Sequence, residues 1–187
     1  PSFAHLPLLT GKEGKLSKRL GSLGVRELRE EGVEAMAISS FLAKLGTSEA
    51  IEPFYDLNTL AASLDFAKIG RSQPKFDVDE LKIFNTKFVH AAPYAYVKER
   101  AGVDEAFWNA VKGNLETVDD INAWKGICHQ KVKPVIEDEA LTSAAAELLP
   151  PEPWNEETWS AWVNEVKAQT GKKGRDLFHP IRKALTA

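Results

Sequence analysis

Two lysines and an arginine fall within five residues near the start of the chain, in the run Lys15–Arg19, which reads KLSKR. Gly11, Gly14 and Gly21 surround this run, and glycine allows the backbone to approach a ligand closely. Backbone N–H groups and cationic side chains can together hold phosphate oxygens and stabilise the negative charge that develops in phosphoryl or nucleotidyl transfer. The residues alone leave a second interpretation open, that of a solvated basic turn.

Two other kinds of site do not fit the residues. The spacing from Gly11 to Ser17 lacks the four-residue gap of a P-loop, and no βαβ pattern follows it. The only cysteine is Cys128, and the four histidines are scattered along the chain at His5, His90, His129 and His179. We therefore expect neither a disulfide framework nor a metal site.

The net charge of −3 hides an uneven distribution. Residues 1–30 hold six Lys or Arg and three acids, whereas residues 134–166 hold eight acids and neither Lys nor Arg. Residues 167–187 hold six bases and a single acid, Asp176. Basic zones on both sides of an acidic middle are typical of a protein that binds a polyanion at two separate places, and ordinary surface variation is the alternative.

Length and composition indicate a globular protein of one or two domains, since 187 residues are 43% hydrophobic and 27% charged. No apolar run is long enough to span a membrane, and the start does not resemble a signal peptide. One cysteine agrees with a reducing compartment, so we expect a cytoplasmic protein. The first residue is Pro1 rather than methionine, which suggests a piece of something longer.

The apolar spacing predicts an all-α fold with one short edge strand, over residues 3–9. Ile38, Phe41, Leu42 and Leu45 form one helical stripe, and Leu81, Phe84 and Phe88 form another that begins after Asp77 and ends before Pro93. Further helices are expected over residues 93–100, 104–113, 117–127, 134–149 and 155–170, and from 176 to the end, with Pro180 in the first turn of the last. Helical spacing places Trp108, Trp159 and Trp162 in the core, whereas Trp124 and Trp154 lie nearer helix ends. Trp124 is kept as a candidate for stacking on an RNA base.

Several blocks, taken in order, resemble the C-terminal half of bacterial glutamyl-tRNA synthetases, starting just before the KMSKS-type signature loop. They are His5–Leu9, Gly11–Gly14, Lys15–Arg19, Leu28–Gly32, Phe41–Gly46, Phe76–Asn85, Gly171–Arg175 and His179–Thr186. Details at residues 45–48 and 151–154 resemble the alphaproteobacterial branch. The resemblance covers the whole chain.

The resemblance implies a class I enzyme that activates glutamate with ATP and Mg²⁺ and transfers it to tRNA. In the family pattern, Lys18 is the catalytic lysine, which contacts the ATP phosphates and stabilises charge as pyrophosphate leaves. Lys15 and Arg19 match the flanking ATP-binding positions, and Ser17 shapes the loop and donates to the nucleotide. Because most of that active site lies outside this chain, the chain by itself is expected to be inactive, to hold no bound cofactor and to have a mobile loop.

The resemblance also implies three domains. Residues 1–25 match the end of the catalytic domain, residues 26–92 a helical stem-contact domain, and residues 93–187 a helical anticodon-binding domain truncated at its C-terminus. Arg182 matches an arginine that contacts an anticodon base. Lys172, Lys173 and Arg175 are expected to meet tRNA phosphates, which positions the tRNA without reading its sequence.

One departure concerns the choice of tRNA. Some family members carry an arginine between the positions of Val111 and Trp124 that separates glutamate tRNA from glutamine tRNA, and here Thr117 stands nearest to it. Threonine cannot copy the bidentate donation of arginine to a base edge. We therefore expect tRNA(Glu) and also tRNA(Gln) as partners. The protein is expected to be a monomer that binds no DNA.

The alternative function for the whole chain is a free-standing helical RNA-binding or protein-interaction module without catalysis.

Overall fold

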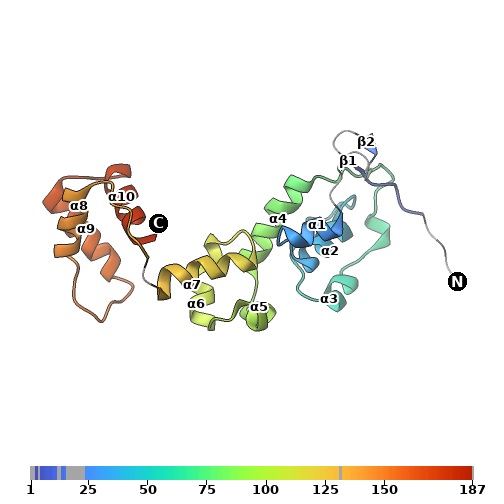
Figure 1. Ribbon diagram of the computed structural model, residues 1–187. Coiled ribbons are helices and arrows are strands. Elements are labelled where there is room, and N and C mark those ends of the chain that lie inside the picture. The colour runs from blue at the N-terminus through green and yellow to red at the C-terminus, as the bar shows by residue number, and fades with distance from the viewer. Residues whose placement is uncertain (1–2, 4, 12–13, 16–23, 131, 187) are drawn as a thin grey trace. The chain divides into compact units, whose positions relative to one another are not determined.

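The computed structural model describes residues 3, 5–11, 14–15, 24–130 and 132–186 (Figure 1). Its regular structure is helical except for one two-stranded hairpin, which confirms the predicted all-α class. The elements are β1 (Thr10–Gly11), β2 (Gly14–Lys15), α1 (Val25–Glu30), α2 (Ala35–Lys44), α3 (Leu57–Ala62), η2 (Phe66–Lys68), α4 (Val78–Ala91), α5 (Tyr94–Ala101), α6 (Glu105–Val111), η3 (Lys112–Asn114), η4 (Val118–Asp120), α7 (Ile121–His129), α8 (Glu139–Glu147), α9 (Thr158–Thr170) and α10 (Arg175–Thr186).

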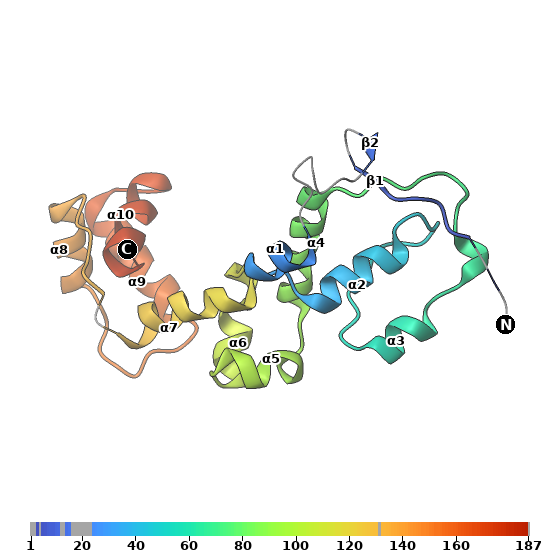
Figure 2. The ribbon, with the colours of Figure 1, turned by 45° about the vertical axis from the view of Figure 1, so that its right-hand side comes forward.

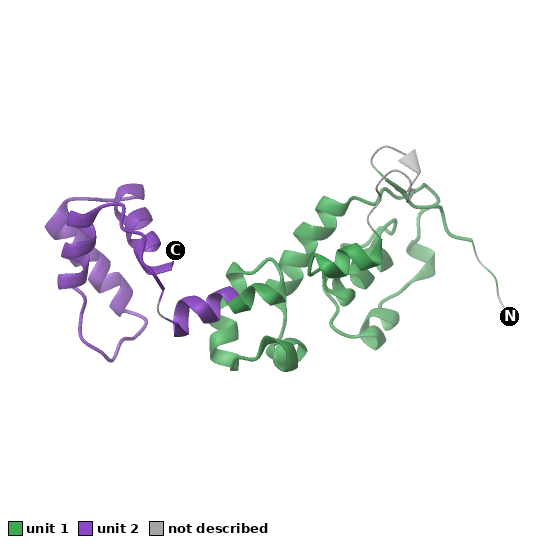
Figure 3. Cartoon of the chain, viewed as in Figure 1, with its two compact units in different colours: residues 1–122 green, residues 123–187 purple. Residues whose placement is uncertain are grey.

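The chain divides into two compact units, residues 1–122 and residues 123–187 (Figure 3). The domain boundaries expected near residues 25 and 92 both fall inside unit 1 and stay predictions. In the described part of the chain, no helix has the length and apolarity needed to cross a bilayer.

The strand near the N-terminus lies later in the chain than expected. Residues 5–9 form no strand, whereas Thr10 pairs antiparallel with Lys15, and Gly11 with Gly14. The Thr10 backbone N–H donates to the Pro74 carbonyl at 3.0 Å, and the Phe76 N–H donates to the Thr10 carbonyl at 2.7 Å. These bonds anchor the hairpin to the segment that leads into α4.

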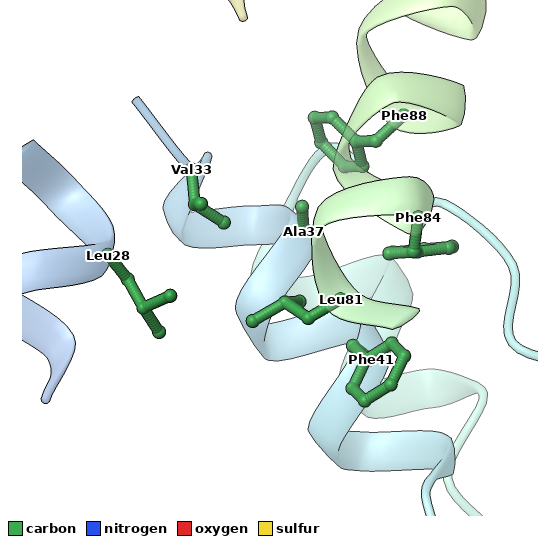
Figure 4. Packing of buried hydrophobic residues seen from close by; sticks show 7 residues of the cluster. All are labelled: Leu28, Val33, Ala37, Phe41, Leu81, Phe84 and Phe88. Carbon is green, nitrogen blue, oxygen red and sulfur yellow. The ribbon is translucent and has the colours of Figure 1, made fainter. Parts of the chain in front are cut away.

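The core of unit 1 forms where α2 packs against α4 (Figure 4). The predicted stripe on α4 is confirmed, since Leu81 and Phe88 are fully buried and Phe84 is 7% exposed. On α2 the buried stripe is rotated from the expected one. Ala37 and Phe41 face the core, whereas Leu42 is 40% exposed. Seven residues make up this cluster: Leu28, Val33, Ala37, Phe41, Leu81, Phe84 and Phe88.

In unit 2, helices α8, α9 and α10 pack around one small core (Figure 2). The buried residues of this core are Leu141, Ala145, Trp162, Val163, Val166, Leu177 and Ile181. The indole of Trp162 donates to the Ala145 carbonyl at 2.8 Å, which satisfies its N–H and ties α9 to α8.

Two helices of unit 2 differ from the sequence prediction. The helix expected from residue 134 begins at Glu139, because the Asp138 side chain caps it by accepting the Leu141 N–H at 3.0 Å. Pro180 lies inside α10 rather than in its first turn, since that helix already begins at Arg175, after Gly174 with φ +58°. Residues 134–138 therefore lie outside α8, with Asp138 as its N-cap.

Candidate nucleic-acid interface

The predicted ATP-binding loop is described only at its start. The backbone of Lys15 is fixed in β2 by pairing with Thr10, and Thr10 is held by Pro74 and Phe76. Ser17, Lys18 and Arg19 lie outside the described residues. The expected mobility of the loop concerns these same residues and stays a prediction. The hairpin that enters the loop is thus attached to unit 1, beside the first turn of α4.

Glu34, at the start of α2, links this helix to α5 through its carboxylate and to α4 through its backbone N–H. Glu34, which is 6% exposed, precedes α2. Its carboxylate accepts one hydrogen bond from each terminal guanidinium nitrogen of Arg100 in α5, at 3.0 and 2.7 Å. The Tyr96 hydroxyl donates to the same carboxylate at 2.9 Å, and the Glu34 backbone N–H donates to Asn85 of α4 at 2.9 Å. Burial, reinforced by the Glu34 charge, raises the pKa of Tyr96 well above its usual value. Sequence reasoning missed this cluster, because a buried glutamate has no signature in a helical pattern.

Thr117 lies in unit 1, where its side chain is part of a local cap. Thr117 and Asp120 form a capping box that opens η4, at the start of the helical segment expected over residues 117–127. The Asp120 carboxylate accepts the Thr117 N–H at 2.8 Å. A Cβ placed on Gly32 would meet the Thr117 methyl at 2.9 Å, and Gly32 has φ +78°. Thr117 is therefore packed tightly against the turn between α1 and α2, and no arginine stands at residues 113–120.

The C-terminal helix of unit 2 carries the basic residues predicted to meet RNA. Arg175, His179 and Arg182 are spaced by four and three residues, which places them on one face of α10. Leu177 and Ile181 on another face are buried. Arg182 and Arg175 are exposed, and so is Lys173 just before the helix; within the described residues no ion pair holds any of the three. They can therefore meet a phosphate or a base without losing an internal partner.

The remaining cations of residues 172–183 are paired with acids. Lys172 donates to Asp138, and Lys183 donates to Glu137, which also lies 3.1 Å from Nδ1 of His179. The hydrogen bond from Lys183 lowers the pKa of Glu137, and the hydrogen bond from Lys172 lowers the pKa of Asp138. Lys172 was predicted to meet phosphate, and the structure gives it an internal carboxylate partner. These pairs could not be predicted from the sequence, because the expected helix included residues 137 and 138.

The tryptophans divide differently from the prediction. Trp108 and Trp162 are buried as expected, whereas Trp159 is 48% and Trp154 54% exposed. Trp154 and Trp159 line an apolar groove of about 470 Å³ between α8, α9 and α10, and this groove keeps Trp159 partly accessible. Trp124 is half-buried in α7, and its predicted contact with a base stays a prediction.

No group of histidine, cysteine or acidic side chains in the described part of the chain is arranged to hold a metal ion. The exposed groups of this surface include cations and aromatic rings, which are groups that bind phosphates and bases.

Comparison with known proteins supports the resemblance seen in the sequence. The chain is 48% identical over 194 residues to the glutamate–tRNA ligase of Azospirillum brasilense and 44% identical over 193 residues to glutamate–tRNA ligase 1 of Maricaulis maris. Each alignment includes the whole chain and 43% of the relative. No family model matches the chain.

Solved structures agree on the fold. The crystal structure of glutamate-tRNA synthetase from Elizabethkingia anophelis matches 97% of this chain and 44% of its own, with a TM-score of 0.63 at 22% identity. A glutamate tRNA ligase from Elizabethkingia meningosepticum, solved with its amino acid, matches 99% of this chain and 45% of its own, with a TM-score of 0.68 at 22% identity. The chain thus spans less than half the length of the relatives that it matches, and from end to end it corresponds to one part of bacterial glutamate–tRNA ligases.

Proposed function

We propose that this chain is the tRNA-recognising part of a glutamate–tRNA ligase, and that unit 2 binds the anticodon region. The observation that carries the proposal is the exposed basic face of α10, where Arg175 and Arg182 lie on one side of the helix and form no ion pair with any described residue. Arg182 contacts an anticodon base in this proposal, and Lys173 and Arg175 contact phosphates. In unit 1 the helices around the α2–α4 core contact the tRNA stem.

Catalysis belongs to the longer enzyme in this proposal. There, the loop that starts at Lys15 meets ATP and Mg²⁺, with Lys18 stabilising the charge of departing pyrophosphate. The anchoring of the hairpin to Pro74 and Phe76 supports this role, because it connects the loop directly to the tRNA-binding helices. The enzyme is then a cytoplasmic monomer, and the chain alone does not catalyse the reaction.

The binding proposal is tested with the 187-residue chain and transcripts of glutamate tRNA. We expect tighter binding to the native transcript than to one with a changed anticodon, and we expect Arg182→Ala to abolish that difference. A direct base contact is worth about 1–3 kcal/mol of discrimination. Lys167→Ala, which removes one exposed charge from α9 of the same unit, is the matched control. Equal loss in both variants would show that Arg182 contributes only charge.

The absence of an arginine at residues 113–120 and the packing of Thr117 against Gly32 support a second point about specificity. We propose that discrimination between glutamate tRNA and glutamine tRNA is relaxed. Aminoacylation of the two tRNAs side by side by the intact enzyme tests this, and strict charging of glutamate tRNA would refute it.

A further inference from the structure

Two carboxylates before α8 cover part of the basic surface of unit 2. Glu137 contacts Lys183 and His179 of α10, and Asp138 contacts Lys172. We call Glu137 and Asp138 the acidic pair. These contacts join residues of the acidic middle to residues of the basic end that lie 34 to 46 positions away in the sequence.

The cations of residues 172–183 therefore form two groups. Lys173, Arg175 and Arg182 are exposed and unpaired among the described residues, whereas Lys172, His179 and Lys183 are half-buried and held by the acidic pair. Lys183 directly follows Arg182 on α10, and Lys172 directly precedes Lys173. The acidic pair thus neutralises the two lysines that adjoin the first group in the sequence.

Neutralisation affects the two modes of RNA binding unequally. Sequence-independent binding depends almost entirely on lysine and arginine replacing the counterions of the phosphates. Specific binding has base contacts in addition. A carboxylate that is paired with a lysine must be displaced before a phosphate can contact that lysine. The pairing therefore lowers the affinity most for RNA that is bound through charge alone.

From these contacts we propose that Glu137 and Asp138 are specificity-determining residues. They compete with RNA phosphates for Lys172 and Lys183, and this competition lowers the affinity of unit 2 for non-cognate RNA. The proposal rests on the proposed function of unit 2 as an RNA-binding surface. Capping alone does not require the charge at residue 138, because asparagine caps a helix as well as aspartate does. Both contacts of the Glu137 carboxylate are with side chains of α10.

Charge-neutral variants of the whole chain test the proposal. Glu137→Gln and Asp138→Asn keep the size of each side chain, and Asp138→Asn keeps the cap of α8. We measure binding to poly(U) and to the glutamate tRNA transcript over a range of salt concentrations. Each released lysine should raise affinity for poly(U) about fivefold at 0.1 M salt and steepen its log–log salt slope by about 0.7. The gain for the tRNA should be smaller, so that the ratio of the two affinities falls.

Glu139→Gln is the matched control, because it makes the same change in net charge within two residues of the acidic pair, at an exposed side chain that forms no ion pair with the described residues. An effect of Glu139→Gln equal to that of Glu137→Gln, or an unchanged salt slope in both acidic-pair variants, would overturn the proposal. Circular dichroism checks that α8 is intact in each variant. Equal affinity of the unmodified chain for poly(U) and tRNA would instead count against the proposed function, and the comparison of variants on poly(U) would still decide the role of the acidic pair.

Discussion

The substitution Arg100→Met probes the buried Glu34 carboxylate, which holds α5 against α2 in unit 1. Methionine keeps the aliphatic part of the side chain but removes two charge-assisted hydrogen bonds, of 3.0 and 2.7 Å, and the guanidinium that lies 5.6 Å from the Tyr96 ring centre. Removing one partner of a fully buried ion pair costs about 3–5 kcal/mol. The Arg100 side chain is 51% exposed, so water can reach the vacated position, and we expect a loss of about 2 kcal/mol.

Urea unfolding measures this loss, and hydrogen exchange followed by mass spectrometry assigns it to unit 1. Lys98→Met, on the exposed side of the same helix, should change the free energy of unfolding by less than about 0.5 kcal/mol. The double variant Glu34→Gln with Arg100→Met removes the stranded charge and should be more stable than Arg100→Met alone. A double variant that is less stable than the single one, or equal losses for Arg100→Met and Lys98→Met, would refute the idea that Arg100 compensates a buried charge.

Three other perturbations have expected outcomes. Phe88→Ala empties a fully buried site that contacts Tyr55 and Tyr96 and should cost about 3–5 kcal/mol in urea unfolding, whereas Phe66→Ala, at a side chain 73% exposed, should cost little. The folded pKa values of Glu137 and Asp138 lie below the ordinary 4.5 and 3.8, so the stability that these carboxylates contribute is complete above the ordinary values and is lost as the pH falls through the folded pKa values. In an acid titration, the free energy of unfolding of the double variant Glu137→Gln/Asp138→Asn should therefore depend less on pH than that of the unmodified chain. An identical pH dependence of the two proteins would contradict this prediction. In the intact enzyme, Lys18→Ala should slow glutamate activation far more than it weakens ATP binding, and unchanged pyrophosphate exchange would exclude the role of Lys18.

The sequence predicted best those features that depend on local periodicity and capping. The stripe Leu81, Phe84, Phe88 and the caps at Asp77 and Asp104 are all present, because a helix surface repeats every three to four residues and a cap needs only its own turn. The start of α8 lies five residues after the predicted one: Pro134 and Asp138 both suit a helix start, and the structure has the cap at Asp138.

Features that depend on long-range contacts could not be read from the chain. The Glu34–Arg100 pair joins residues 66 positions apart, and the Glu137–Lys183 pair joins residues 46 apart. A basic residue in the sequence is only a potential RNA contact until its neighbours are known. For Lys172 the structure supplies an acidic neighbour, and for Arg182 it leaves the side chain exposed.

Chemical footprinting of glutamate tRNA bound to the 187-residue chain tests the central claim most directly. Cleavage of the tRNA backbone is compared with and without the protein, and again with Arg182→Ala. If unit 2 binds the anticodon region and unit 1 the neighbouring stem, protection should cover the anticodon loop and one side of that stem, and Arg182→Ala should remove it at the anticodon. Protection spread evenly over the tRNA, or confined to the acceptor end, would contradict the account.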